Sequence, residues 1–261
     1  MNLHATLPGP TCIVRIEGIS ARERMERIEE FTDERNKSWC IHCGRSLVTV
    51  ETNLDHVPTK SLLTKPRPHH LPVVEICREC NNGFSRDEQY FVTFLSCVLS
   101  GSVDPAKQPI SSAARALTKS AGLASLMERA KREYRTRGGE DKVFWVPDME
   151  RVHRVVLKNA RGHAYYEFGE PMLDEPVNVW ASPLEFMTAS ERADFEGFGG
   201  GGLVGLPEVG SRMMTRVFSG LDLSEGWISV QAGRYRYSVE QDGGIVVRSI
   251  IAEYLATEVR W

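Results

Sequence analysis

Apolar and polar positions alternate with a helical period in the first half of the chain and with a strand-like period in much of the second half. Residues 20–36 alternate acidic and basic side chains around sparse apolar ones, which predicts an exposed amphipathic helix. From about Ser85 onward apolar residues recur every three to four positions, and Ser85 with Glu88 has the spacing of a capping box, which predicts a longer helix. Residues 111–137 predict further helix, with a break near Gly122.

Short runs of β-branched and aromatic residues, bounded by turn residues, predict strands. The predicted strands are 47–50, 71–76, 143–146, 152–157, 165–168, 227–230 and 235–239, and a further apolar periodic segment covers 245–261. These elements divide the chain into four expected parts: an N-terminal extension over 1–38, a motif-bearing domain over 39–100, a helical connector over 101–140, and a mostly β domain over 141–261.

Composition narrows the class of protein. The 261 residues are 41% hydrophobic and 26% charged, which is ordinary for a soluble globular protein. The N-terminus lacks a basic flank followed by an apolar run, and no run of 18 apolar residues occurs, so we expect a cytoplasmic protein with no membrane partner. The formal net charge of -3 gives no global basic field, so any binding of nucleic acid must use local patches.

Four of the six cysteines form two Cys-x-x-Cys pairs, Cys40/Cys43 and Cys77/Cys80. Two thiolates three positions apart can face one ion when a tight turn follows, and Gly44 supplies the flexibility for that turn. Without an export signal, clustered cysteines indicate metal ligands rather than disulfides. The two pairs therefore predict a four-cysteine structural Zn²⁺ site.

The first pair has a second interpretation. The segment Trp39-Cys-Ile-His-Cys43 is similar to the redox centre of thioredoxin-like oxidoreductases. Such a centre has a strand immediately before it and a helix starting at its first cysteine. Here a charged, predicted helix precedes the motif, Gly44 follows it and a second pair lies downstream, so zinc binding is the favoured interpretation.

The sequence between and after the cysteine pairs contains further polar motifs. Leu54-Asp55-His56-Val57-Pro58 lies between the pairs, and Asn81-Asn82 directly follows Cys80. Together with Cys40-Ile-His-Cys43-Gly44, this order of motifs resembles the HNH endonucleases, in particular the ββα-metal (His-Me finger) subset whose two Cys-x-x-Cys pairs hold a structural zinc. The resemblance covers residues 39 to about 95. It implies a zinc-stapled ββα-metal unit. With the helical segment and the mostly β C-terminal domain that the sequence pattern predicts after it, the expected fold class is α+β.

The resemblance also implies roles for single residues. His56 matches the general base that takes a proton from the attacking water, Asp55 matches the carboxylate that binds the catalytic metal, and Asn81 matches the position that completes the metal site from the helix start, with Asn82 as a rival. A neutral imidazole suits proton abstraction near neutral pH. Carboxylate and amide oxygens suit Mg²⁺ or Mn²⁺. Pro72 stands where many family members have an asparagine that pins the loop.

The implied substrate is DNA. Lys60, Arg78 and Arg86 lie near the motifs and are candidate phosphate contacts, and the basic cluster over 129–137 is a candidate patch for the nucleic-acid backbone. Residues 141–261 offer a surface for a homodimer or a partner protein. The chief alternative is a non-catalytic zinc module that binds nucleic acid or protein, in which the Asp-His dipeptide is incidental.

Overall fold

The computed structural model describes residues 25–29, 34–135, 137–197, 207–241 and 243–261. The helices among them are α1 (Arg78–Ser100), α2 (Ser111–Lys119), α3 (Ala121–Ala130), α4 (Met149–Phe168), α5 (Ala189–Glu196) and α6 (Arg212–Ser219). The strands are β1 (Thr52–His56), β2 (Val73–Cys77), β3 (Lys131–Arg135), β4 (Asp141–Trp145), β5 (Asn178–Pro183), β6 (Leu223–Ser224), β7 (Trp227–Gln231), β8 (Tyr235–Gln241), β9 (Ile245–Ile251) and β10 (Leu255–Arg260). The expected mixture of helix and strand, with a sheet near the C-terminus, is confirmed.

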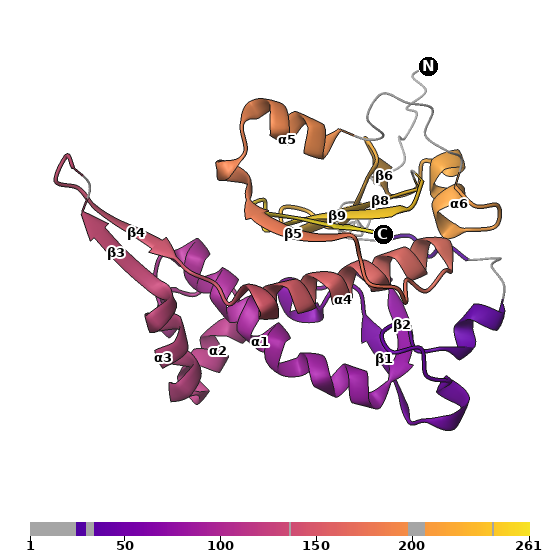
Figure 1. Ribbon diagram of the computed structural model, residues 1–261, viewed down its shortest axis with the longest axis horizontal. Helices are drawn as coiled ribbons and strands as arrows, with labels where there is room; N and C mark the ends of the chain where they lie inside the picture. The colour runs from indigo at the N-terminus through magenta and orange to yellow at the C-terminus, as the bar shows by residue number, and fades with distance from the viewer. Residues whose placement is uncertain (1–24, 30–33, 136, 198–206, 242) are drawn as a thin grey trace, which may run out of the picture.

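The helix α4 lies at the centre of the molecule, between a large sheet on one side and the unit β1–β2–α1 on the other (Figure 1). Asp148 caps its N-terminus by accepting a hydrogen bond from the backbone N–H of Arg151, and Gly169 ends it in the left-handed conformation with a φ of 75°. Because both sides of α4 are covered, its buried residues include polar ones such as Lys158 and His163. This helix positions residues of the C-terminal half against the motif-bearing segment.

The predicted strands over 152–157 and 165–168 are wrong, because both segments belong to α4. The run of β-branched residues near Val155 favours a strand locally, but such preferences are weak and packing overrides them. The buried positions Val152, Val155, Val156, Ala160 and Ala164 follow a helical period.

The large sheet contains six antiparallel strands in the order β5-β10-β9-β8-β7-β6. On the face toward α4, Tyr235 and Tyr237 are buried, and the ring of Tyr237 stacks on His163 with the centroids 3.7 Å apart. On the other face Arg236 covers the ring of Trp227 at 4.8 Å, near Phe195 of α5. The sheet is therefore covered on both faces.

The unit that contains the motifs is a hairpin followed by a helix. β1 and β2 pair antiparallel, with Asp55 opposite Val74 and His56 opposite Val73. Cys77 ends β2 and is also the N-cap of α1. The helix thus begins at Arg78, well before Ser85, and the capping box predicted from Ser85 and Glu88 is wrong.

Three further sequence predictions concern the N-terminal segments and the region after α1. Residues 47–49 form a 3-10 turn rather than a strand. Of the helix predicted over 20–36, residues 25–29 have no regular structure and 34–38 form a 3-10 helix, while the other positions lie outside the described residues. The break predicted in the segment 111–137 is confirmed, at Ser120.

The end of that segment is not helical. β3 pairs antiparallel with β4 to form a hairpin that projects from the body beyond α3 (Figure 1). The basic cluster over 129–137 therefore lies mainly on a two-stranded ribbon. Within the part of the chain that the structure describes, no helix has the length and apolar character needed to cross a bilayer.

Candidate functional site

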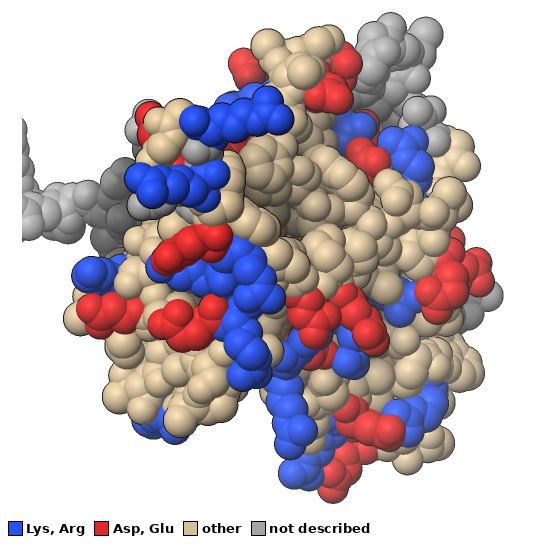
Figure 2. Space-filling model, turned by 60° about the vertical axis from the view of Figure 1, so that its left-hand side comes forward, with Lys and Arg blue, Asp and Glu red and all other residues tan. Residues whose placement is uncertain are grey.

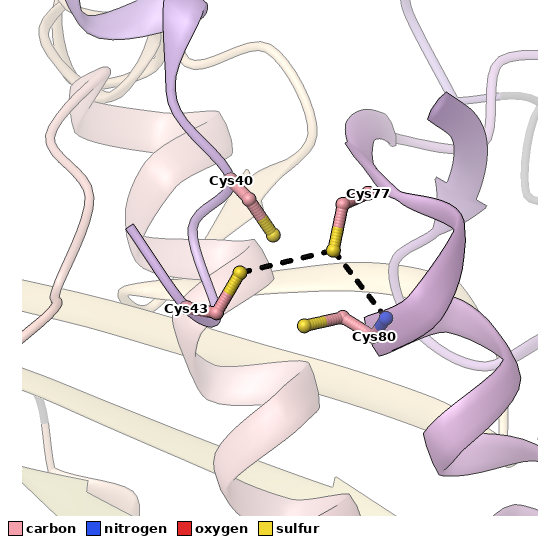
Figure 3. Close-up of side chains that lie close together, drawn as sticks. All are labelled: Cys40, Cys43, Cys77 and Cys80. Carbon is pink, nitrogen blue, oxygen red and sulfur yellow. Dashed lines mark hydrogen bonds between the residues drawn. The ribbon is translucent and has the colours of Figure 1, made fainter. Parts of the chain in front are cut away.

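The four paired cysteines lie on two tight structures that face each other (Figure 3). In the first, the N–H of Gly44 donates to the carbonyl of Cys40 at 2.8 Å, and Gly44 has a φ of 68°, which glycine adopts without strain. In the second, Cys77 and Cys80 lie at the start of α1, and the N–H of Cys80 donates to the Sγ of Cys77 at 3.4 Å. Two turns far apart in sequence thus bring four sulfur atoms together.

The sulfur geometry fits a metal ion. The four Sγ atoms all lie within 4.8 Å of one another, and the Cys43–Cys77 pair is 3.7 Å apart. Tetrahedral zinc with zinc–sulfur bonds of about 2.3 Å would separate its sulfur ligands by about 3.8 Å. Cys40 and Cys77 are buried, whereas Cys43 is exposed. The predicted cluster of Cys40, Cys43, Cys77 and Cys80 is confirmed as a group that could hold a metal ion.

Two arginines lie beside this cluster. The Nε of Arg45 donates to Cys43 at 3.4 Å, and Arg45 also pairs with Glu79 at 2.6 Å. Arg161 on α4 is buried and donates to the carbonyl of His42 at 3.4 Å. Cationic side chains near thiolates offset the negative charge of a four-thiolate site.

The second cluster surrounds Lys158, a residue of α4 whose side chain is only 2% exposed. Its Nζ lies 2.9 Å from each carboxylate oxygen of Asp55, 2.5 Å from Oε1 of Glu88 and 3.2 Å from Oγ1 of Thr59. An ammonium group has three hydrogens to donate, and these partners satisfy all of them. Asp55, the predicted metal ligand, is therefore ion-paired with a lysine from the other half of the chain.

The loop that follows β1 is fixed to α4 at this point. The buried Thr59 donates its backbone N–H to Oδ1 of Asn159 at 3.1 Å and its hydroxyl to Oε1 of Glu88 at 2.7 Å. One turn further along α4, a Cβ on Gly162 would lie 2.5 Å from a methyl group of Val57. The missing side chain of Gly162 thus allows α4 to approach the residue that follows His56.

His56 ends β1 and is half-buried. Burial lowers the pKa of His56 to about 4, together with the positive charges of Lys60, Lys158 and Arg67. The imidazole is consequently neutral at physiological pH and can accept a proton. In Asp55 burial raises the carboxyl pKa, and the charge of Lys158 opposes that rise.

The other predicted residues lie elsewhere on the β1–β2–α1 unit and its loop, and the structure brings Asp55 together with Glu88 and Lys158 rather than with these residues. Asn81 is half-buried in the first turn of α1, and its carbonyl accepts a hydrogen bond from the hydroxyl of Ser85. Lys60 is exposed at the start of a 3-10 turn (Lys60–Leu62). Arg78 is exposed and pairs with Glu51 at 2.6 Å. Arg86 is also exposed, on the outer side of α1.

Three residues of this site are not predicted from sequence. Lys158 and Asn159 directly follow the predicted strand over 152–157, and Glu88 is interpreted from sequence as a helix cap in preference to a contact of the metal site. The available signal is the helical period of the apolar residues from Val152, bounded by Asp148 and Gly169 as N-cap and C-cap. Even that signal predicts only the helix, because the contact with β1 is tertiary.

Comparisons of this chain with models of protein families, with curated proteins and with solved structures found no match.

Proposed function

We propose that this protein is a metal-dependent endonuclease of HNH type that hydrolyses DNA phosphodiester bonds. The observation that carries the proposal is the order of elements: β1 ends in Asp55-His56, pairs with β2, and β2 leads through Cys77 directly into α1. A hairpin followed by a helix, with the histidine at the end of the first strand, is the arrangement that the resemblance implies.

His56 would act as the general base. Because its pKa is lowered to about 4 by burial and by Lys60, Lys158 and Arg67, it is already in the neutral form that accepts a proton from water. The negative charge of a bound phosphate would offset those positive neighbours and raise the pKa of the imidazole toward the range of an effective base. Lys60 and Arg67 would then serve as phosphate contacts.

The four cysteines would hold zinc as a structural ion. Four thiolates complete a tetrahedral shell and leave no open position for water, which is the composition of structural rather than catalytic zinc sites. The site joins the turn after Cys40 to the start of α1 and lies beside the small apolar core of Ile41, Val74 and Ile76. So small a core requires such support.

Asp55 and Asn81 would hold Mg²⁺ or Mn²⁺, which when bound polarises the phosphoryl oxygen and stabilises the leaving oxygen. The present contacts of Asp55 fit this role only in part, because both of its carboxylate oxygens face Lys158. The carboxylate would have to exchange the ammonium group for the ion.

The β3–β4 hairpin is the candidate surface for the DNA backbone. Residues 129–146 contain six basic and three acidic side chains in a chain whose net charge is -3. Arg132, Tyr134 and Phe144 are exposed on the hairpin, and the two aromatic rings lie 5.7 Å apart. Figure 2 shows Lys and Arg interspersed with Asp and Glu on this side of the molecule, so a local ribbon rather than a whole face would contact phosphate.

The pairing of Asp55 with Lys158 favours one alternative function. If that ion pair is purely structural, the chain is a non-catalytic zinc module that binds nucleic acid or protein. Breaking a buried ion pair is costly, which is a sufficient reason for the pair to persist without catalysis.

One substitution separates the two functions. We expect the zinc-loaded protein to nick supercoiled plasmid in Mg²⁺ or Mn²⁺ but not in chelator, and His56→Ala to lose about a hundredfold or more of that rate. His70→Ala, at an exposed position in the neighbouring loop, is the matched control and should cleave at the wild-type rate. Equal rates for wild type and His56→Ala, with zinc bound in both, would leave the non-catalytic module as the function.

A further inference from the structure

Lys158 is placed like a bound cation rather than like an ordinary surface lysine. Its ammonium group lies between two carboxylates that come from different elements, Asp55 at the end of β1 and Glu88 in α1. The helix α4 carries the lysine to this point from the opposite side. One positive charge therefore faces two negative groups, and the cluster retains an excess of negative charge.

A second buried ion pair on α4 shows what distinguishes this cluster. Glu167 pairs with Arg216 at 2.9 Å, and their side chains are 0% and 1% exposed. In contrast, Asp55 is 12% exposed and Glu88 is 22% exposed, although Lys158 between them is buried. Both carboxylates are thus partly exposed to solvent, while the lysine approaches them from the protein interior.

We propose that Lys158 competes with a divalent cation for Asp55 and Glu88, so that the ion binds only where the ammonium group is displaced or absent. This inference rests on the proposed function in its choice of Asp55 as a metal ligand, and it adds Glu88 to the site. Both cations are attracted by the same oxygen atoms, and Lys158 is tethered within 3 Å of them. A tethered competitor lowers the apparent affinity for the ion, because the ion must displace the ammonium group to reach the carboxylates.

Loss of the Lys158 charge should be measurable in the absence of DNA. Replacing Lys158 with a neutral residue leaves two neighbouring carboxylates without their cation, which destabilises the protein and at the same time creates a stronger site for a hard divalent ion. Added Mn²⁺ should therefore restore the stability that the substitution removes.

The test measures Mn²⁺ binding by calorimetry on the zinc-loaded full chain. We expect Lys158→Met and Lys158→Gln to bind Mn²⁺ at least about tenfold more tightly than wild type, since each removes a positive charge within a few ångströms of the ion. Both variants should also show a larger rise in melting temperature on adding Mn²⁺. Lys158→Gln keeps a hydrogen-bond donor for Glu88, so it provides a folded variant if the methionine variant is unstable.

Two controls test whether the gain in Mn²⁺ affinity arises at Asp55 and Lys158. Lys131→Met removes a lysine that pairs with Glu133 at 2.8 Å on the hairpin, and it should leave Mn²⁺ affinity unchanged. Adding Asp55→Asn to Lys158→Met should abolish the gain. The proposal is overturned if neither neutral variant gains more than about twofold in affinity, if the gain survives Asp55→Asn, or if both variants remain unfolded at millimolar Mn²⁺.

Nuclease activity is a separate readout. Plasmid cleavage by wild type that is lost in His56→Ala supports the proposed function whatever the Mn²⁺ affinities are. A gain in Mn²⁺ affinity in a protein that cleaves no DNA would support the competition by Lys158 and count against the nuclease.

Discussion

The molecule has two clusters that suit cations, and they are assembled in different ways. The sulfur cluster uses two short motifs, Cys40/Cys43 and Cys77/Cys80, each formed by a local turn, and its four sulfur atoms converge on one another. The oxygen cluster uses Asp55 and Glu88, and these converge on Lys158. The first cluster could hold an ion from outside, whereas the second already contains a cation of its own, so the two differ in what they offer a metal ion.

The largest expected effect is loss of the sulfur cluster. Cys77→Ser should release zinc and destabilise the protein by about 5 kcal/mol or more, because metal binding contributes directly to the folding of such small units. Zinc content and thermal unfolding are the measurements. Cys97→Ala, which removes a buried thiol outside the cluster, should keep one zinc per chain. Retention of zinc and stability in Cys77→Ser would contradict the structural role of the cluster.

A smaller effect is expected at the fully buried ion pair of α4. Glu167 accepts hydrogen bonds from Arg216 at 2.9 Å and from the hydroxyl of Tyr237 at 2.6 Å. Glu167→Gln leaves the buried guanidinium short of a partner and should cost roughly 3 kcal/mol, as measured by denaturant unfolding. Because Glu167 cannot be reached from solvent, Mn²⁺ should not restore this loss. If Mn²⁺ restored the stability of Glu167→Gln as much as that of Lys158→Met, the Glu167–Arg216 pair and the Lys158 cluster would not differ in access to the ion.

A smaller effect again is expected at the contact between α4 and the end of β1. Gly162→Ala would place a Cβ 2.5 Å from Val57, so it should cost about 1–3 kcal/mol through overpacking and should also lower the rate of cleavage. Gly83→Ala, in α1 with open space around the new Cβ, should gain about 0.5–1 kcal/mol. If both alanine variants are equally stable, the close approach of α4 is not what positions the residues after His56.

The smallest effect concerns pH. Burial, with the charges of Arg216 and Lys158, holds the pKa of His163 well below its ordinary value of 6.5. The unfolded chain therefore takes up a proton below pH 6.5 that the folded protein does not, so this contribution to stability is complete above pH 6.5 and is lost as the pH falls below it. In urea unfolding, the free energy of unfolding should fall by up to about 1.4 kcal/mol for each pH unit below 6.5 because of this residue. His163→Gln should lack this part of the pH dependence. An unchanged slope in that variant would contradict the assignment.

The difference between the two clusters also explains what the sequence could predict. The cysteine pairs, β2 and a long helix after them follow from local spacing and periodicity, and all three are present. The position of Lys158 does not follow from local sequence, because the lysine is brought to Asp55 only when α4 packs against the hairpin. Glu88 illustrates the same limit: its spacing from Ser85 fits a helix cap, yet the helix already begins at Arg78 and Glu88 faces α4.

Counting the ions that each variant binds shows whether Lys158 takes the place of a second cation. Wild type and Lys158→Met, both loaded with zinc, would be equilibrated with the same low concentration of Mn²⁺ and weighed intact by native mass spectrometry. We predict one zinc and little manganese in wild type, and one zinc with one manganese in Lys158→Met. Equal manganese content in the two proteins would contradict the claim that Lys158 occupies the place of a second cation.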